Sequence, residues 1–531
     1  MPEQSLNIQV WILRLAFLSL LGLLAVNWPR LRKLVAEEPR AIRWSLLLVL
    51  VAGVVVRVGW SLWSVNHENA IGWVIFEDAA RLDHFPSYGL GGHVLYNAWL
   101  KLFGTRPDVI FAGNFVLASL TPLLLFMLVR RLFGCSRGAL LAAALIALNP
   151  VHVRLSASES LHIPAMFFAL LTLVALHVAL QSRDAWLPVL LAAVSFALAV
   201  QTRPLGVLLI LPVVASLLLR PRAEGIRWRW LALGAAMAFV LCAVHGMWLW
   251  ERVQDSSGMS FFRVAPRDIL PRLIQPAKHA FVDPAVTPLA LQVLVVLGLV
   301  GMLVRRWRSA IVVLAILLPA VYLNTTHGQN PVEHLRFHLG VLPWFALSAG
   351  GATLLLEKVS GRGKDAVFAL VVLVVAASLP LHRSVLSPRY DAHRELSFWQ
   401  TQLSEFPPGF SKAATLVSLD RFQADHSLTT ELPISWFAAF RWTTGRFVSA
   451  SDYLRNPARK VLWYRGITCW YHEPNSEPAK GPAMRELCRR VEESGTLRPI
   501  VETAFEANPA RFRVRVPEMT IGFYELTQGS R

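Results

Sequence analysis

Charged residues are scarce in this chain. Only 16% of its 531 residues are Asp, Glu, Lys or Arg, against about 25% in soluble domains, while 55% are hydrophobic. A soluble enzyme of several domains is therefore excluded. Cysteine is also scarce, and the 4 present do not have the spacing of a metal-binding framework. The sequence contains no internal repeat and no low-complexity tract.

Long apolar runs are present instead, and they recur from Val10 to Leu381. Runs of about 17–22 residues match the roughly 30 Å hydrocarbon core of a bilayer. The first run lacks a small-residue cleavage motif, so we expect a span and not a signal peptide. The sequence predicts an all-α polytopic membrane protein with about twelve transmembrane helices, near 9–27, 45–63, 109–129, 138–155, 163–181, 187–202, 204–219, 230–250, 288–304, 309–324, 337–356 and 366–382.

The net charge of +18 is placed in a way that indicates a membrane topology and not a nucleic-acid partner. Cations gather in alternate short connections, which are 28–44, 130–137, 182–186, 220–229, 305–308 and 357–365. The positive-inside rule makes these loops cytoplasmic. Both termini are then expected outside the cytoplasm, together with a first outer loop at residues 64–108.

The hydropathy pattern of the sequence changes near Arg383. Residues 383–531 contain no membrane-length run and mix short β-like stretches ("AATLVSL", "KVLWY", "RFRVRV", "TIGFYEL") with the helical "GPAMRELCRRVEESG". No glycine-rich nucleotide-binding pattern occurs there. We predict a transmembrane domain at 1–382 and a small extracytoplasmic α/β domain at 383–531.

Acidic residues gather in the first outer loop, in "NHENAIGWVIFEDAARLDHF". The apolar spacing predicts a short helix over 69–82 lying on the membrane. Glu68, beside His67, precedes this helix at an apolar boundary, where partial desolvation suits a general base. A charge that complements the helix dipole is the alternative. Glu77 and Asp78 are rival acids, although Glu77 is also spaced for a surface ion pair with Arg81.

Other candidate side chains lie at the outer ends of later spans. Glu159 and His162 can share a helix face if the span begins there, and could hold a substrate hydroxyl or a divalent ion such as Mg or Mn; the alternative is a capped helix start. Arg203, Arg336 and Arg57 are interfacial or intramembrane cations. They are candidates for a phosphate site, although snorkelling to headgroups is the simpler explanation of such residues.

Cys469 and Cys488 both fall in the predicted extracytoplasmic domain, where disulfides can form. Cys469 follows a predicted strand and Cys488 lies within a predicted helix. A strand that returns to a packed helix can bring two cysteines within disulfide distance. We therefore predict a bond between them, with two buried thiols as the alternative.

Four stretches in this order resemble the GT-C superfamily of integral membrane glycosyltransferases. The group includes protein O-mannosyltransferases and lipid A aminoarabinose transferases. The stretches are "GGHVLYNAWLKLFG" (91–104), "ALNPVHVRLSASESLHIPAMFF" (147–168), "LAVQTRPLGVLLILP" (198–212) and "RFHLGVLPWFALSAG" (336–350). The resemblance covers roughly 45–357. The family's acidic pair corresponds to His67-Glu68, so its first acid is missing here.

The resemblance implies a GT-C-like fold in a bacterial inner (plasma) membrane and a polyprenyl-phosphate sugar as donor. It gives Glu68 the role of catalytic base, and Arg203 and Arg336 that of holding the donor phosphate. A glycan, lipid or protein hydroxyl would be the acceptor. Two alternatives remain open, namely a lipid-linked glycan transporter or polymer ligase, and a non-catalytic GT-C-like binding protein.

Overall fold

The structure is a computed structural model that divides into two compact units. It describes residues 2–60, 70–86, 89–105, 107–182, 185–219, 228–255, 287, 289–324, 339–358, 368, 415–418, 447–466, 469, 480–505 and 519–528. One unit contains Met1–Trp63 and Asp78–Leu386, and the other contains Ser64–Glu77 and Ser387–Arg531. Each unit is described by itself below.

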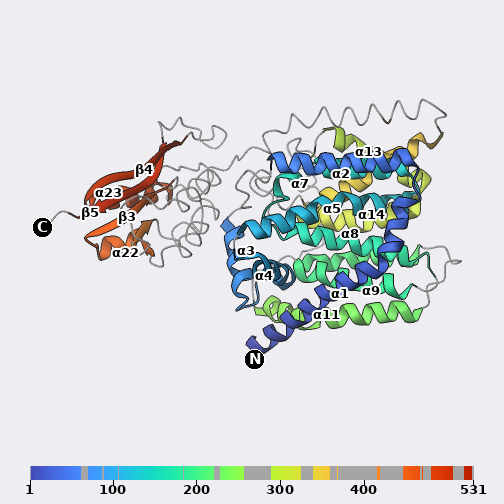
Figure 1. Ribbon diagram of the computed structural model, residues 1–531, viewed down its shortest axis with the longest axis horizontal. Helices are drawn as coiled ribbons and strands as arrows, with labels where there is room; N and C mark the ends of the chain where they lie inside the picture. Colours follow the sequence, from blue (N-terminus) through green and yellow to red (C-terminus); the bar gives the residue numbers. More distant parts are fainter. Residues whose placement is uncertain are drawn as a thin grey trace. The chain divides into compact units, whose positions relative to one another are not determined.

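The first unit is a bundle of helices (Figure 1). Its elements in chain order are α1 (Pro2–Ala36), α2 (Arg40–Trp60), the end of α3 (Ala70–Arg81), α4 (Leu90–Phe103), α5 (Pro107–Phe133), α6 (Ser136–Leu148), α7 (Pro150–Leu155), α8 (His162–Ala179), α9 (Trp186–Thr202), η1 (Pro204–Leu209), α10 (Ile210–Leu218), α11 (Trp228–Asp255), α13 (Leu289–Arg305), α14 (Trp307–Asn324), α16 (Leu342–Gly350) and η3 (Gly351–Lys358).

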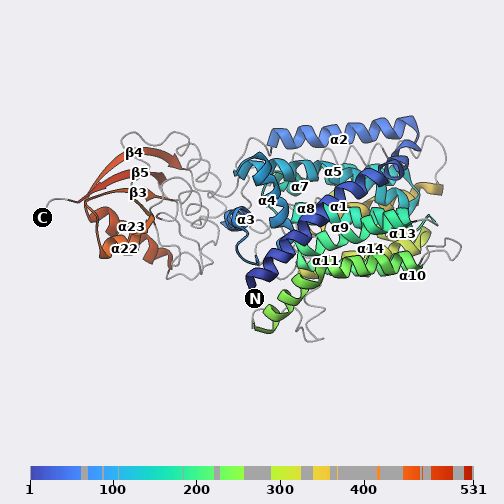
Figure 2. The same ribbon diagram turned by 60° about the horizontal axis from the view of Figure 1, so that its bottom comes forward.

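Helix α8 forms the centre of this bundle because it is apolar on every side. Nearly all of its side chains are buried, and it packs against α5 and α9. Helices α2 and α11 lie at opposite margins (Figure 2). These outer helices expose large apolar side chains such as Leu48 and Phe239, as expected for surfaces that face lipid.

In the part of the chain that the structure describes, helices occupy eleven of the twelve predicted spans, and five of these helices are long and apolar enough to cross a membrane. The protein is therefore an integral, multi-pass membrane protein. Apart from Phe368, the twelfth span at 366–382 lies outside the described residues, so the count of twelve remains a prediction. Span 138–155 is divided into α6 and α7, because Asn149 caps α7 and Pro150 occupies its first turn.

A buried acid links two helix corners at the end of the bundle where the predicted cytoplasmic basic loops lie. Glu38, in the α1–α2 corner, forms an ion pair with Arg130 and accepts a hydrogen bond from Ser136, so this corner is fixed to the α5–α6 corner. Exposed tryptophans mark the same end of several helices and are Trp28, Trp44, Trp186, Trp228 and Trp307. Such a belt is typical of a membrane–water interface.

The described residues of the second unit form a five-stranded mixed sheet in the order β2-β1-β3-β5-β4. The strands are β1 (Leu416–Ser418), β2 (Phe447–Ser449), β3 (Lys460–Arg465), β4 (Thr496–Phe505) and β5 (Met519–Thr527). Strand β1 is parallel to β2 and β3, while β5 is antiparallel to β3 and β4. Helices α22 (Ala450–Arg455) and α23 (Lys480–Glu493) pack on one face, around Trp463, Tyr453 and Val491.

Sequence reasoning found most of this sheet but missed two strands. The predicted stretches correspond to β1, β3, β5 and α23, while "RFRVRV" lies outside the described residues. Strand β2 has three residues and no alternating pattern. Strand β4 contains Pro499, which argues against a central strand. It is tolerated here because β4 is at the edge of the sheet formed by the described strands, with a register shift between Pro499 and Val501.

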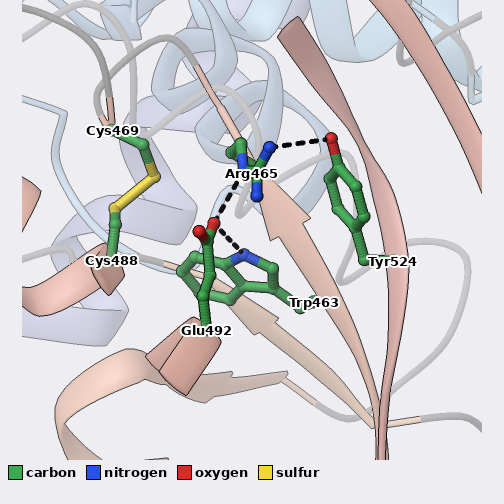
Figure 3. Close-up of a disulfide and its surroundings, with 6 residues drawn as sticks. All are labelled: Trp463, Arg465, Cys469, Cys488, Glu492 and Tyr524. Carbon is green, nitrogen blue, oxygen red and sulfur yellow. Dashed lines mark hydrogen bonds and ion pairs between the residues drawn. A yellow bond between two sulfur atoms is a disulfide. The ribbon is translucent and has the colours of Figure 1, made fainter. Parts of the chain in front are cut away.

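A disulfide joins Cys469 and Cys488, with 5.8 Å between their Cα atoms (Figure 3). Beside it, Arg465 Nε and Trp463 Nε1 both donate to Glu492 Oε1, at 2.6 and 3.1 Å. The Arg465 guanidinium also lies 4.5 Å from the ring centroid of Tyr524. Burial raises the pKa of Tyr524 to about 12, so its hydroxyl remains a donor to Glu502.

Replacing both Cys469 and Cys488 by serine is expected to lower the free energy of unfolding of the second unit by about 3 kcal/mol. The bond closes a loop of 19 residues, and a loop of this size loses that much entropy in the unfolded chain. Denaturant unfolding of the full chain would measure the change. The matched control replaces Cys135 and Cys242, which are free; an equal effect of both double variants would contradict the expectation.

Candidate active site

Three segments distant in the sequence meet at the start of α4. They are the glycines at Gly89–Gly92, the loop before α8 and the end of α9. A Cβ atom on Gly91 would lie 2.9 Å from the Gln201 backbone, and one on Gly92 would lie 2.4 Å from Leu161 Cδ2. The glycines therefore allow the start of α4 to approach the end of α9 and the loop before α8 closely. Three of the four family-like stretches named above thus come together.

A buried polar network holds the loop before α8 in place. Asn114 Nδ2, from α5, donates to the Ser158 carbonyl and to Tyr96 Oη, both at 2.6 Å. Tyr96 Oη lies 3.2 Å from the carbonyl oxygens of both Glu159 and Ser160. These side chains satisfy buried backbone groups of a non-helical segment, and they thereby hold Glu159 in place within the loop.

A second network fixes the end of α9. Gln201 Nε2 donates to the Leu241 carbonyl of α11 at 2.6 Å, and Gln201 Oε1 bonds the His245 ring. Phe85 stacks on His245 with ring centroids 6.2 Å apart. Arg203 follows directly, in extended backbone between α9 and the proline that begins η1. Its side chain is half-buried, next to the convergence of segments.

Glu159 and His162 are placed differently from the helical expectation. Helix α8 begins only at His162, so Glu159 lies in the preceding loop and the two do not share a helix face. Glu159 is buried and His162 is half-buried. Within the ranges that the structure describes, no three His, Cys, Asp or Glu side chains gather as a metal site. The Mg or Mn ion thus remains a prediction.

The predicted helix at 69–82 is confirmed as α3, Ala70–Arg81. Asp78 Oδ1 lies 3.4 Å from His84 Nε2, and Asp83 accepts from His84 Nδ1 at 2.6 Å. This hydrogen bond lowers the pKa of Asp83. Leu82 ends the helix with φ of 51°. Glu77 lies in α3, but its side chain, together with Glu68, His67 and Arg336, falls outside the described residues.

Arg57 is occupied by contacts within the bundle. Its guanidinium donates to the carbonyls of Gly53 and Ala147 at 2.8 and 2.9 Å, and to His152 Nδ1 at 2.6 Å. The side chain is fully buried. These partners favour a role in holding α2 against α6 and α7, so we leave Arg57 out of the phosphate site proposed below.

Sequence reasoning did not select Tyr96, Asn114, Gln201 or His245. A signal was available, because amide and imidazole side chains are costly inside membrane-length apolar runs and usually have partners there. Their partners were not predictable, since each hydrogen bond named above joins segments at least 18 residues apart in the sequence.

Replacing Gly89 by alanine is expected to destabilise the protein and to lower its activity. Gly89 has φ of +110°, and a Cβ there would lie 2.6 Å from the Gln201 carbonyl oxygen. Gly104→Ala is the matched control, because Gly104 has φ of +102° with no atom within 4 Å of the new Cβ. Both variants carry strain of about 1–2 kcal/mol. Gly89→Ala should lower the free energy of unfolding by about 1–3 kcal/mol more than Gly104→Ala. Equal thermal unfolding temperatures of the two variants would contradict this.

Comparison with known proteins gives a family match and several structural matches. Residues 90–248 match the family model of dolichyl-phosphate-mannose-protein mannosyltransferases. This range contains α4, the loop before α8, α9 and most of α11, which are the elements that meet at the site. No curated protein matches the sequence.

Three solved structures have a similar fold at low identity. ArnT from Cupriavidus metallidurans in the apo state is 13% identical with a TM-score of 0.53, and the match covers 92% of this chain and 98% of that one. ArnT from the same organism bound to undecaprenyl phosphate is 13% identical with a TM-score of 0.52, over 86% and 96%. Arabinofuranosyltransferase AftD from Mycobacteria is 15% identical with a TM-score of 0.52, over 92% and 40%.

The family model and the shared fold agree with the resemblance seen in the sequence. Residues 90–248 are therefore similar to the dolichyl-phosphate-mannose-protein mannosyltransferases, and the chain has the fold of the GT-C membrane glycosyltransferases.

Proposed function

We propose that this protein moves a sugar from a polyprenyl-phosphate donor to an acceptor hydroxyl outside the cytoplasm. The convergence of the glycines at the start of α4, the loop before α8 and the end of α9 is the observation that carries the proposal. The family model spans all three segments except Gly89. The donor class is supported by the ArnT structure that contains undecaprenyl phosphate.

The proposed reaction is one inverting displacement. Glu68 removes the proton of the acceptor hydroxyl, whose oxygen forms a bond to the anomeric carbon. The bond from that carbon to the phosphate oxygen breaks, and the phosphate leaves with the electron pair. Arg203 and Arg336 hold the phosphate and stabilise its increasing charge. Holding the donor and the acceptor in reactive geometry supplies much of the remaining rate acceleration.

Other predicted side chains take supporting places in this proposal. Glu77 and Asp78 are alternative bases in the same loop. His67, Glu159 and His162 are candidates for binding the substrate or a divalent ion, which would neutralise the leaving phosphate if it is bound. The acceptor would be a glycan, a lipid or a protein, guided by the domain at 383–531. A disulfide in that domain supports its placement outside the cytoplasm.

A transfer assay with a defined donor tests the proposal. The protein would be reconstituted in liposomes with a radiolabelled polyprenyl-phosphate sugar and a mixture of envelope glycans. We expect free polyprenyl phosphate and a product of inverted anomeric configuration. Movement of intact donor across the bilayer would favour a transporter, transfer of a preformed polymer would favour a ligase, and binding without cleavage would favour a non-catalytic protein.

A further inference from the structure

Arg14 is a cation inside the apolar helix α1, which precedes the residues matched by the family model. The apolar part of this helix runs from Gln4 to Ala36. Around Arg14, the side chains of Trp11, Leu15 and Leu18 are largely exposed on the bundle surface. A guanidinium at such a position is costly in lipid, so it indicates either a polar partner or a functional site.

The depth of Arg14 follows from the two exposed tryptophans of α1. Trp11 and Trp28 are 62% and 54% exposed and lie 17 residues apart. At 1.5 Å per residue they are separated by about 26 Å, which is close to the roughly 30 Å thickness of the hydrocarbon core. Trp11 therefore marks one interface, and Arg14 lies one helical turn inside it.

Arg14 reaches towards the elements of the candidate site. Its Nη2 donates to Asn97 Oδ1 of α4 at 3.4 Å, and Asn97 Nδ2 donates to the Ala79 carbonyl of α3 at 2.8 Å. The guanidinium lies 4.9 Å from the ring centroid of Trp11. This cation is thus at the same end of the bundle as α3 and α4, between the lipid-facing surface and the site.

The hydrogen-bonding capacity of Arg14 is largely unused. A guanidinium has five N–H donors and stays protonated in proteins. Among the described residues no carboxylate pairs with Arg14, and its bond to Asn97 is long. The half-buried side chain can therefore offer a planar pair of donors to an anion. At the depth of a membrane interface, the anion of matching geometry is a lipid phosphate.

We propose that Arg14 binds the phosphate of a polyprenyl-phosphate lipid at the α1–α4 contact. This inference rests on the proposed function and adds a second phosphate position to it. Asn97 lies eight residues after Gly89, or about 12 Å along α4, so the position is separate from the one next to Arg203. It would hold the lipid where it enters or leaves the site. The headgroup phosphate of an ordinary phospholipid has the same chemistry and is the competing source.

Binding measurements on the purified full chain test this site without an activity assay. The probes are undecaprenyl phosphate, undecaprenol without phosphate, and phosphatidylglycerol. Arg14→Gln is expected to weaken undecaprenyl phosphate binding about 10-fold, as for the loss of one charged hydrogen bond. Undecaprenol binding should be unchanged. Arg14→Lys should lose less, because lysine keeps the charge but not the planar fork.

Arg30→Gln is the matched control. Arg30 lies on the same helix at the other end, and its guanidinium also donates to an asparagine, Asn27, at 3.4 Å. It should bind all three probes as the wild type does. Equal weakening for phosphatidylglycerol and undecaprenyl phosphate would support a lipid-phosphate site and assign it to the bilayer headgroup. Unchanged binding in Arg14→Gln, or equal loss for undecaprenol, would overturn the proposal.

The inference and the proposed function fail in different ways. If Arg14→Gln binds normally while the wild type transfers sugar, the inference falls and the function stands. If the wild type transfers no sugar but Arg14→Gln selectively loses phosphate binding, a lipid-phosphate site remains in a protein of another function. Glu68→Gln serves as a reference, since it should bind the lipid normally in either case.

Discussion

Replacing Glu68 by glutamine is expected to lower the rate of sugar transfer about 10²–10⁴-fold, the usual contribution of one positioned general base. Glutamine has nearly the same size and cannot accept the proton, so folding and donor binding should be kept. The measurement is the rate of release of polyprenyl phosphate from the labelled donor. Size-exclusion behaviour and lipid binding of the variant would show that only the chemistry is lost.

The same loop contains the two alternative acids, Glu77 and Asp78, and a control acid, Asp83. Glu77→Gln and Asp78→Asn should retain much of the activity, as should Asp83→Asn, whose carboxylate is exposed and bonded to His84. If Glu77→Gln or Asp78→Asn is the inactive variant, the base is a different acid of this loop. If all four variants transfer sugar at the wild-type rate, the mechanism proposed above is wrong.

Arg203→Ala is expected to lower kcat/KM for the donor about 10²–10³-fold, because the leaving phosphate loses a charged donor at the point where its charge increases. Arg203→Lys should recover part of the loss, since it retains the charge but not the bidentate geometry. The same order is expected at Arg336. Steady-state kinetics with varied donor concentration would separate the effect on binding from the effect on turnover.

A cation at the opposite end of the bundle controls for charge alone. Arg229 stacks on Trp230 with 4.5 Å between its guanidinium carbon and the ring centroid, near the start of α11. Arg229→Ala should leave the kinetics unchanged. Normal kinetics in Arg203→Ala would reduce that residue to a membrane anchor, and identical losses in Arg203→Ala and Arg229→Ala would indicate a general charge effect.

Local features of the sequence were the most predictable. The short helix α3 and the separation of α9 from η1 around Arg203 follow from apolar spacing and from Pro204, which act within one or two turns. The bond between Cys469 and Cys488 was also predictable, because Cys469 follows a predicted strand and Cys488 lies within a predicted helix. Arg57 could not be interpreted in this way, because its partners Ala147 and His152 lie about 90 residues along the chain.

The sequence by itself determined that this is a multi-pass membrane protein with a small α/β part and GT-C-like segments, since hydropathy and residue order are properties of the chain alone. Only the tertiary structure decided which segments meet. The contacts of Gly92 with Leu161, of Tyr96 with the Glu159 carbonyl and of Arg14 with Asn97 depend on how the helices pack. No local pattern encodes such contacts, because close backbone approach and buried hydrogen bonds are selected jointly when the whole bundle excludes lipid and water.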